Sequence, residues 1–366
     1  MTALSFALPE GIDTPTVLVD VDALEQNITS WAARMRERGV GLRPHTKTSK
    51  CLQVIERQVQ AGVVGLTVAT LGEAEVLADA GFTELFQAFP LWAGRPGVAH
   101  RLRALHERTS LMIGVESVES AAALGAAVRG SDRPLRVLIE LDPGLHRTGV
   151  SPGHAVAIAR AAADAGLEVH GAFTFGGHGY GSCDMPAHAG DDEVRTLAQA
   201  AEQLRSAGFE PTVLSAGSTP TALHSARPPV TDERPGTYVF HDAQQVQLGV
   251  ATMGEVSLVV AATVVACHPG DGRFVLDAGS KALAADRPGI VSGHGMLPAY
   301  PQANLERLSE HHCVAHTEGP LPRVGEVVAV VPNHCCVVVN LVDRLTVVQR
   351  GEVVDHWPVA SRGRNS

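Results

Sequence analysis

The sequence is poor in lysine. Of its 29 basic residues, only those at positions 47, 50 and 281 are lysine, and the other 26 are arginine. Arginine keeps its proton at physiological pH, so Schiff-base chemistry with a carbonyl group requires an amine. Nearly all basic residues of this chain are arginine, so a lysine that is kept is of interest. Lys47, which comes just after a short predicted strand, is therefore a candidate for such chemistry. An ordinary solvated cation is the alternative interpretation.

Long hydrophobic runs and basic clusters are also missing. The longest apolar run, residues 256–267, is shorter than the ~20 residues that a membrane-spanning helix needs, and it contains Ser257 and Thr263. Residues 1–6 show no basic region followed by an apolar core, so no signal peptide is predicted. A net charge of −10 disfavours nucleic acid or an anionic membrane as a partner. We therefore predict a cytoplasmic protein that acts on a small molecule.

Cysteine is too scarce for a disulfide framework, with six residues in a chain of 366. Free thiols or metal ligands are the better interpretation, above all for the adjacent pair Cys335 and Cys336. The hydrophobic content of 45% and the charged content of 19% are typical of a globular protein. The length predicts one large domain with a second one appended.

From residue 41 onwards, short apolar runs alternate with alanine-rich segments of helical periodicity. The eight runs are residues 41–44, 63–69, 85–89, 111–115, 136–141, 169–174, 212–216 and 237–240. Helices are expected between them, for example at 71–80, 118–128, 154–165 and 192–207, and an earlier helix should run from 22 towards 37. Eight alternations predict a parallel (β/α)8 barrel of the TIM type rather than a doubly wound sheet.

Beyond residue 249 the helical patterns give way to valine-rich runs. These are residues 256–267, 274–276, 326–331, 337–341 and 345–349. They predict an antiparallel β domain, which a strand at 16–19 is expected to join. The predicted class is therefore α/β plus β, with a barrel at residues 22–248 and a β domain formed by residues 1–21 and 249–366. Residues 361–366 form a polar tail.

Polar residues follow several predicted barrel strands, and in such a barrel the strand ends converge on one face. Lys47 follows the first strand, Arg147 the fifth, and His178 and Tyr180 the sixth. Segments rich in glycine and hydroxyl groups, of the kind that bind phosphate, follow or bound the last two strands at 217–220 and 234–238. An amine and a phosphate cradle on opposite sides of a barrel mouth are what a pyridoxal phosphate (PLP) site requires. Each loop taken singly is more often a plain turn.

His334 and Cys336 are separated by one residue after a valine-rich run. In an extended segment, alternate side chains face the same way, so these two can bind one ion while Cys335 points elsewhere. Imidazole with thiolate favours zinc over manganese or magnesium. Two protein ligands leave positions open for water or substrate, as in a Lewis-acid site. The alternative is that both residues are simply buried.

Together these residues show a resemblance to the fold-type III PLP enzymes, in the branch that contains D-serine dehydratase and D-threonine aldolase. The resemblance covers nearly the whole chain, and its motifs occur in the family's order. They include Pro44-His45-x-Lys47-Thr48, Asp142-x-Gly144-x-x-Arg147-x-Gly149, Gly177-His178-x-Tyr180, Gly217-Ser218-Thr219-Pro220, Arg234-Pro235-Gly236-x-Tyr238 and Pro332-Asn333-His334-x-Cys336. The resemblance implies an alanine-racemase-like barrel, a β domain partly built from the N-terminal strand, and a homodimer with active sites near the subunit interface.

The resemblance also implies roles for individual residues. Lys47 resembles the Schiff-base lysine, and Arg147 the arginine near the phenolic oxygen of the cofactor. His178 and Tyr180 match residues that line the pocket. The residues matching the phosphate site are Thr219, Gly236, Thr237 and Tyr238, with Ser218 beside them as a further cofactor-binding candidate. Family members often carry a tyrosine where this chain has Phe173, a departure that bears on a hydrogen bond to the cofactor ring.

The predicted reaction is the dehydration of a D-β-hydroxy amino acid, such as D-serine or D-threonine, to a 2-oxo acid and ammonia. Lys47 would remove the α-proton, and zinc on His334 and Cys336 would help the hydroxyl to leave. The family's dehydratases typically show histidine-x-cysteine, whereas aldolases often place aspartate second, which favours the dehydratase. The alternatives are a D-threonine aldolase with His178, His311 or His312 as the base, an amino acid racemase, and a non-catalytic cofactor-binding module.

Overall fold

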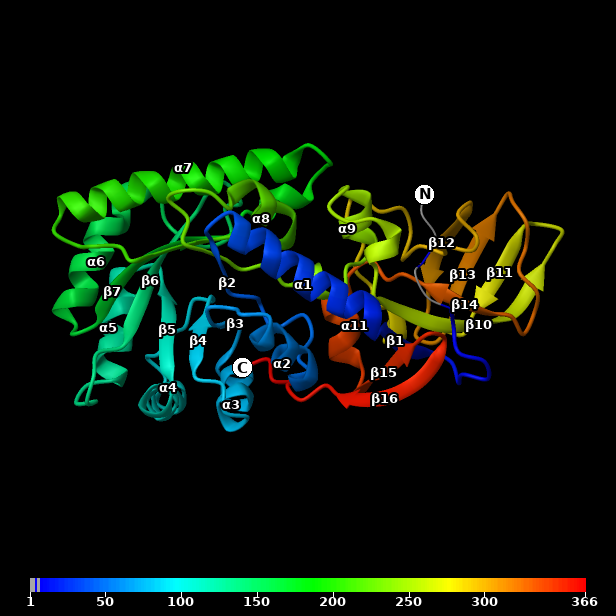
Figure 1. Cartoon of the computed structure of the whole chain (residues 1–366), viewed down its shortest axis with the longest axis horizontal. Coiled ribbons are helices and arrows are strands. Elements are labelled where there is room, and N and C mark those ends of the chain that lie inside the picture. Colours follow the sequence, from blue (N-terminus) through cyan, green and yellow to red (C-terminus); the bar gives the residue numbers. More distant parts are fainter. Residues whose placement is uncertain (1–3, 5–6) are drawn as a thin grey trace.

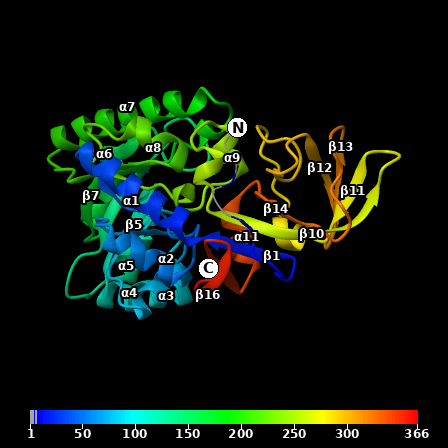
Figure 2. The ribbon, with the colours of Figure 1, turned by 45° about the vertical axis from the view of Figure 1, so that its right-hand side comes forward.

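The computed structural model describes residue 4 and residues 7–366, so the prediction about a signal peptide at residues 1–6 lies outside the described residues apart from Leu4. The chain forms two sheets of eight strands each. The two parts lie side by side along the long axis of the molecule, and they stay separate when it is turned (Figures 1 and 2).

The first sheet is a parallel barrel. Its order is β2 (Gly41–Leu42), β9 (Asp232–Glu233), β8 (Val213–Ala216), β7 (Glu168–Thr174), β6 (Arg136–Leu141), β5 (Ser110–Val115), β4 (Glu84–Gln87) and β3 (Leu66–Val68). A parallel bridge between His45 and Thr67 brings the chain beyond β2 against β3 and joins the two ends of the sheet. The predicted eight-stranded barrel is therefore confirmed.

The eighth strand lies earlier than predicted. Residues 237–240 do not form a strand, because Thr237–Val239 is a 3-10 turn, η3, and β9 at residues 232–233 pairs with β2 and β8 instead. Both residues of β9 are buried acids: Asp232 accepts from Arg43 Nε at 2.9 Å, and Glu233 accepts from Ser225 Oγ at 2.7 Å. A search for apolar runs misses a strand that is made of buried carboxylates.

Helices cover the outside of the barrel. They are α1 (Val21–Glu37), α2 (Leu52–Gln60), α3 (Leu71–Asp79), α4 (Pro96–Arg108), α5 (Val118–Ala127), α6 (Ala155–Asp164), α7 (Met185–Ser206) and α8 (Thr219–Ser225), with the short turns η1 (Pro152–His154) and η2 (Gly177–Tyr180). Asp20 caps α1, because its carboxylate accepts from the Ala23 N–H at 2.7 Å. The apolar stripe predicted for this helix, including Leu24, Ile28 and Trp31, is buried.

The second sheet is mostly antiparallel. Its order is β12 (Ala303–Leu308), β13 (Cys313–Thr317), β11 (Arg273–Leu276), β10 (Leu258–His268), β1 (Thr16–Asp20), β15 (Arg344–Gln349) and β16 (Glu352–Pro358), with β14 (Val327–Val330) also paired to β10. The N-terminal strand β1 joins this sheet as predicted, antiparallel to β10 and parallel to β15. The short helices α9 (Ala243–Gln247), η4 (Met253–Glu255) and α10 (Ser280–Leu283) complete the connections.

The valine run at residues 337–341 is helical, and its prediction as a strand is wrong. It belongs to α11 (Cys335–Leu341), which begins directly after His334. Val338 and Val339 are fully buried, so tertiary packing outweighs the preference of valine for strands. His334 and Cys336 therefore meet at the start of a helix and not along an extended segment.

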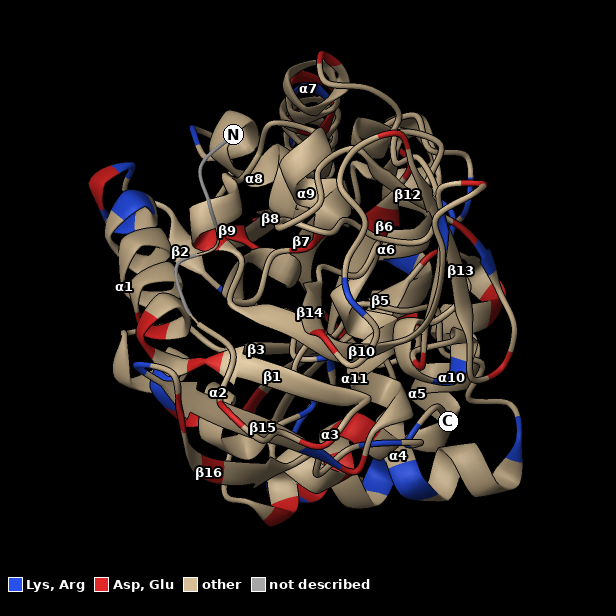
Figure 3. Cartoon of the chain, turned by 90° about the vertical axis from the view of Figure 1, so that its right-hand side faces the viewer, with Lys and Arg blue, Asp and Glu red and all other residues tan. Residues whose placement is uncertain are grey.

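Charged residues of both signs are interspersed on the outer helices α1 and α4, as the view along the molecule shows, whereas α3 carries acidic residues alone (Figure 3). None of the helices in the described part of the chain combines the length and the apolar character needed to cross a membrane. The end of the chain lies against the barrel beside α3 (Figure 1), where the Gly72 N–H donates to Ser366 O at 2.9 Å.

Candidate active site

A cavity of about 430 Å³ lies where the ends of the barrel strands face the start of α11. All predicted site residues except His178 and Tyr238 line it, namely Lys47, Arg147, Tyr180, Ser218, Thr219, Gly236, Thr237, His334 and Cys336. Residues that are 289 positions apart in sequence, such as Lys47 and Cys336, thus share one space.

Lys47 lies in the turn between β2 and α2, and this turn is firmly held. The neighbouring Thr46 donates twice to Thr67 O, from its N–H at 2.8 Å and from its hydroxyl at 3.0 Å. Thr46, Thr48 and Lys50 are all buried, while Lys47 itself is half-buried and borders the cavity. The turn therefore presents one amine to the cavity from a fixed backbone.

The opposite wall carries the features of a phosphate cradle. Gly217 has φ +103, and a Cβ there would lie 2.1 Å from Glu233 Oε2, so the close backbone approach requires glycine. The Gly236 N–H donates to Thr219 Oγ1 at 3.2 Å. The buried Thr237 hydroxyl has no hydrogen-bond partner among the residues that the structure describes. A buried hydroxyl without a partner, beside glycine backbone, fits the phosphate group of PLP.

Glu193 on α7 supports this cradle from behind. Its Oε1 accepts from Thr174 Oγ1 at 3.0 Å, from the Gly176 N–H at 3.0 Å and from the Gly217 N–H at 2.9 Å. Sequence reasoning missed this residue. The available signal was its position, because it shares the helical spacing of Ala189, Leu197 and the other buried small or apolar residues of α7.

The cavity floor combines an aromatic ring with a buried cation. Phe173 packs edge-on against Phe86 at 5.1 Å, and the guanidinium group of Arg234 lies 5.3 Å from the centre of the Phe173 ring. Arg234 Nε donates to Ser215 Oγ at 2.8 Å. The Phe173 ring offers no polar group to the cavity, whereas the adjacent Arg234 does. Sequence reasoning had used Arg234 only as part of a motif.

His45 is a second lining residue that sequence reasoning did not select. Burial, followed by the positive charges of Lys47 and Arg234, lowers the pKa of His45 well below its ordinary value. The Lys47 N–H donates to His45 Nδ1 at 3.4 Å. A neutral imidazole therefore accompanies the lysine turn.

Two predicted residues lie outside the cavity lining. His178 Nε2 lies 3.1 Å from Asp192 Oδ2 on α7. The Tyr238 side chain is fully buried, its hydroxyl accepts from Gln58 Nε2 at 2.8 Å, and its ring packs on Trp31 at 5.2 Å. The Tyr238 phenol is therefore a core group that does not border the cavity. The alternative bases His311 and His312 are exposed and are absent from the cavity lining.

His334 and Cys336 have the chemistry of metal ligands. His334 Nδ1 lies 2.9 Å from Asp286 Oδ2, an arrangement that leaves Nε2 for a metal and is common around metal-binding histidines. A hydrogen bond from Cys335, and then the charge of His334, lower the pKa of the Cys336 thiol. Burial alone would lower the pKa of His334, but Cys336 and Asp286 raise it to about 11. A thiolate, with an imidazole that gives up its Nε2 proton to the metal on binding, fits zinc.

The pair stands without a third protein ligand. Among the residues that the structure describes, no group of three or more His, Cys, Asp or Glu side chains is arranged to hold a metal ion. An ion on His334 and Cys336 would therefore keep open positions towards the cavity.

Two family models match this chain and together span both sheets. Residues 19–244 match the alanine racemase N-terminal domain, and residues 257–348 match the putative serine dehydratase domain. This chain belongs to the fold-type III family of PLP enzymes. Within this PLP-enzyme family, the chain is 34% identical over 351 residues to the D-threo-3-hydroxyaspartate dehydratase of Delftia sp. (strain HT23), covering 89% of this chain and 91% of the relative.

Solved structures of the family agree in fold over the whole length. The Delftia dehydratase superposes with a TM-score of 0.87 at 32% identity, covering 95% of this chain and 97% of that chain. The D-threonine aldolase of Filomicrobium marinum superposes with a TM-score of 0.86 at 30% identity, covering 99% of each chain.

Proposed function

We propose that this PLP enzyme is a zinc-dependent dehydratase, an ammonia-lyase that converts a D-β-hydroxy amino acid to a 2-oxo acid and ammonia. The observation that carries the proposal is the shared cavity, which Lys47 and the cradle border from the barrel and His334 and Cys336 border from α11. Among the full-length relatives, one acts on D-threo-3-hydroxyaspartate and one, from Dictyostelium discoideum, is a D-serine dehydratase. A cysteine-to-alanine variant of the former is described as metal-free.

The two groups that the family and the ligand pair imply would be held on opposite sides of the cavity. Lys47 would hold the PLP aldehyde, and Ser218, Thr219, Gly236 and Thr237 would hold the phosphate. PLP, when bound, supplies an electron-withdrawing ring that makes the α-proton of an amino acid acidic. Zinc on His334 and Cys336 supplies a Lewis acid for a leaving hydroxyl group.

Three side chains of the cavity lining have proposed roles in proton transfer and in cofactor binding. The Lys47 amine is the proposed acceptor of the α-proton, and its fixed turn keeps it at the cavity edge. Arg147, whose guanidinium group lies 4.6 Å from the centre of the Phe175 ring, supplies a positive charge for the phenolic oxygen of PLP. The half-buried Tyr180 lines the cavity together with Ser218 and Cys336, and burial raises the pKa of its phenol, so it stays protonated as a donor.

A D-threonine aldolase is the second candidate, because an aldolase of the family matches this chain over 99% of both lengths. That reaction needs a base for the β-hydroxyl. His178 is held by Asp192 outside the cavity lining, and His311 and His312 are exposed. This placement favours dehydration over cleavage. The solved alanine racemases, at 12 to 16% identity, support the fold alone.

The deciding experiment identifies products. The purified protein, supplied with PLP and zinc, is incubated with D-serine, D-threonine and D-threo-3-hydroxyaspartate, with the L-enantiomers as controls. A 2-oxo acid with ammonia supports the proposal, whereas glycine with an aldehyde overturns it in favour of the aldolase. A chelator should stop turnover while the yellow colour of bound PLP persists. The homodimer and the cytoplasmic location stay predictions.

A further inference from the structure

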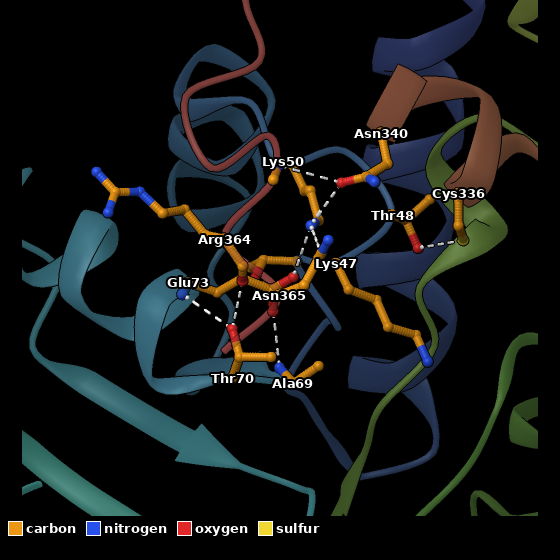
Figure 4. A network of polar contacts seen from close by, with 12 residues as sticks. Lys47, Thr48, Lys50, Ala69, Thr70, Glu73, Cys336, Asn340, Arg364 and Asn365 are labelled. Atoms are coloured by element: carbon orange, nitrogen blue, oxygen red, sulfur yellow. Dashed lines mark hydrogen bonds and ion pairs between the residues drawn. The ribbon is translucent and has the colours of Figure 1, made fainter. Parts of the chain in front are cut away.

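Lys50, the second lysine of the cofactor turn, is buried with an exposed fraction of 5%. Its ammonium group meets three acceptors: Asn340 Oδ1 at 2.9 Å, Asn365 Oδ1 at 3.3 Å and Glu73 Oε1 at 3.3 Å (Figure 4). An ammonium group has three N–H donors, so each is matched to one acceptor. The three acceptors come from three separate segments, namely α11, residues 361–366 and α3.

The acceptor on α11 connects Lys50 to the proposed metal site. Asn340 follows Cys336 by four residues on this helix, so the two side chains lie on one face. The turn also contacts α11 at Cys336 itself, since the sulfur of Cys336 lies 3.3 Å from Thr48 Oγ1. Figure 4 shows both contacts, with the Lys47 side chain extending away from the Lys50 network. Residues 47–50 therefore lie between the proposed cofactor and metal positions.

The acceptor at Asn365 comes from the polar tail, which is tied down along its length. Lys50 O accepts from the Ser361 N–H at 3.2 Å, and the Thr70 hydroxyl donates to Arg364 O at 2.6 Å. Ser366 O accepts from Arg101 Nη2 at 2.9 Å. These bonds hold Asn365 over the ammonium group, and the same tail reaches α11 at one further point, where the Gly363 N–H donates to Asn340 Oδ1 at 3.4 Å.

We propose that Lys50 is a positioning residue that couples the turn carrying Lys47 to the helix carrying Cys336, through Asn340. The inference rests on the proposed function, because it takes Lys47 and Cys336 as the cofactor and metal residues. Glu73 and Asn365 hold the ammonium group in place, and Asn340 transmits its position to α11. Binding of PLP and binding of zinc are then energetically linked, so that each raises the affinity for the other.

The test compares Asn340→Ala with Asn365→Ala in the full chain loaded with PLP. Each variant removes one amide acceptor from the same ammonium group and leaves the buried Lys50–Glu73 pair intact. Asn340→Ala also removes the longer contact with the Gly363 N–H, at 3.4 Å. Removing Lys50 itself would leave Glu73 buried without its partner and endanger folding. Zinc affinity is measured by competition with a chelating dye, PLP occupancy by visible absorbance, and folding by thermal unfolding.

Asn340→Ala should lower zinc affinity about tenfold while PLP absorbance persists. Asn365→Ala should keep the affinity of the unchanged protein. In the wild-type protein, PLP should raise the affinity for zinc. In Asn340→Ala, PLP should raise the zinc affinity by a smaller factor. Unchanged zinc affinity in Asn340→Ala, or an equal loss in both variants, overturns the inference alone. If the wild-type protein binds neither PLP nor zinc, both the proposed function and this inference are overturned.

Discussion

His334 Nδ1 and Asp286 Oδ2 are 2.9 Å apart, so the carboxylate of one segment orients the imidazole of another. Asp286→Ala should therefore lower zinc affinity by about 10- to 100-fold, because the ring loses the partner that directs its second nitrogen towards the cavity. Dye competition measures this affinity. The exposed turn residue Asp271 provides the control, and Asp271→Ala should have no effect. An unchanged affinity in Asp286→Ala would argue against His334 as a ligand.

Lys47 should be indispensable for both colour and turnover. Lys47→Ala removes the amine, so visible absorbance from covalently held PLP should vanish and turnover should fall by roughly 10²- to 10⁴-fold or more. Lys47→Arg should fail equally, because guanidinium does not give up its proton. Lys281→Ala is the matched control, since Lys281 is exposed and pairs with Glu310 at 2.7 Å, away from the cavity lining. A yellow, fully active Lys47→Ala protein would contradict the assignment.

Glu193 should matter for stability and for cofactor retention together. Glu193→Ala leaves three buried donors without an acceptor, at Thr174, Gly176 and Gly217. At about 1–3 kcal/mol for each unsatisfied group, the free energy of unfolding should fall by about 3 kcal/mol or more. Because Gly217 borders the cradle, PLP should also bind more weakly. Glu202→Ala, exposed on the same helix, serves as the control in denaturant titrations and PLP-binding measurements.

His241 should make the fold sensitive to acid. Burial lowers its pKa to about 4, and both ring nitrogens lack a partner within the described structure. Below the ordinary pKa near 6.5, the unfolded chain binds a proton on this histidine that the folded chain excludes. The contribution of neutral His241 to folding stability is therefore complete above pH 6.5 and is lost as the pH falls towards 4. The gap corresponds to about 3 kcal/mol.

Asparagine tolerates the positive φ of 52° at this position. In His241→Asn, the free energy of unfolding should therefore decrease less between pH 7 and pH 4 than it does in the wild-type protein. The exposed His268→Asn should leave the pH dependence as it is. Parallel curves for His241→Asn and the unchanged protein would contradict the assigned pKa.

The barrel, the role of β1 in the second sheet and the family were all readable from the sequence. Each depends on a local signal: apolar runs at strand spacing, helical periodicity between them, and short motifs in a set order. Such signals survive in one dimension because backbone geometry and the burial of one face act over a few neighbouring residues. The same kind of signal failed at β9 and at residues 337–341, where buried ion pairing and packing outweighed composition.

Only the tertiary structure decided which residues meet. Glu193 lies under Gly217, Asp286 faces His334, and Lys50 reaches Asn340 across 290 positions of sequence. It also separated Tyr238, whose phenol is buried in the core, from its neighbour Thr237, which lines the cavity. Contacts of this kind depend on how distant elements pack, and no local pattern of residues records that packing.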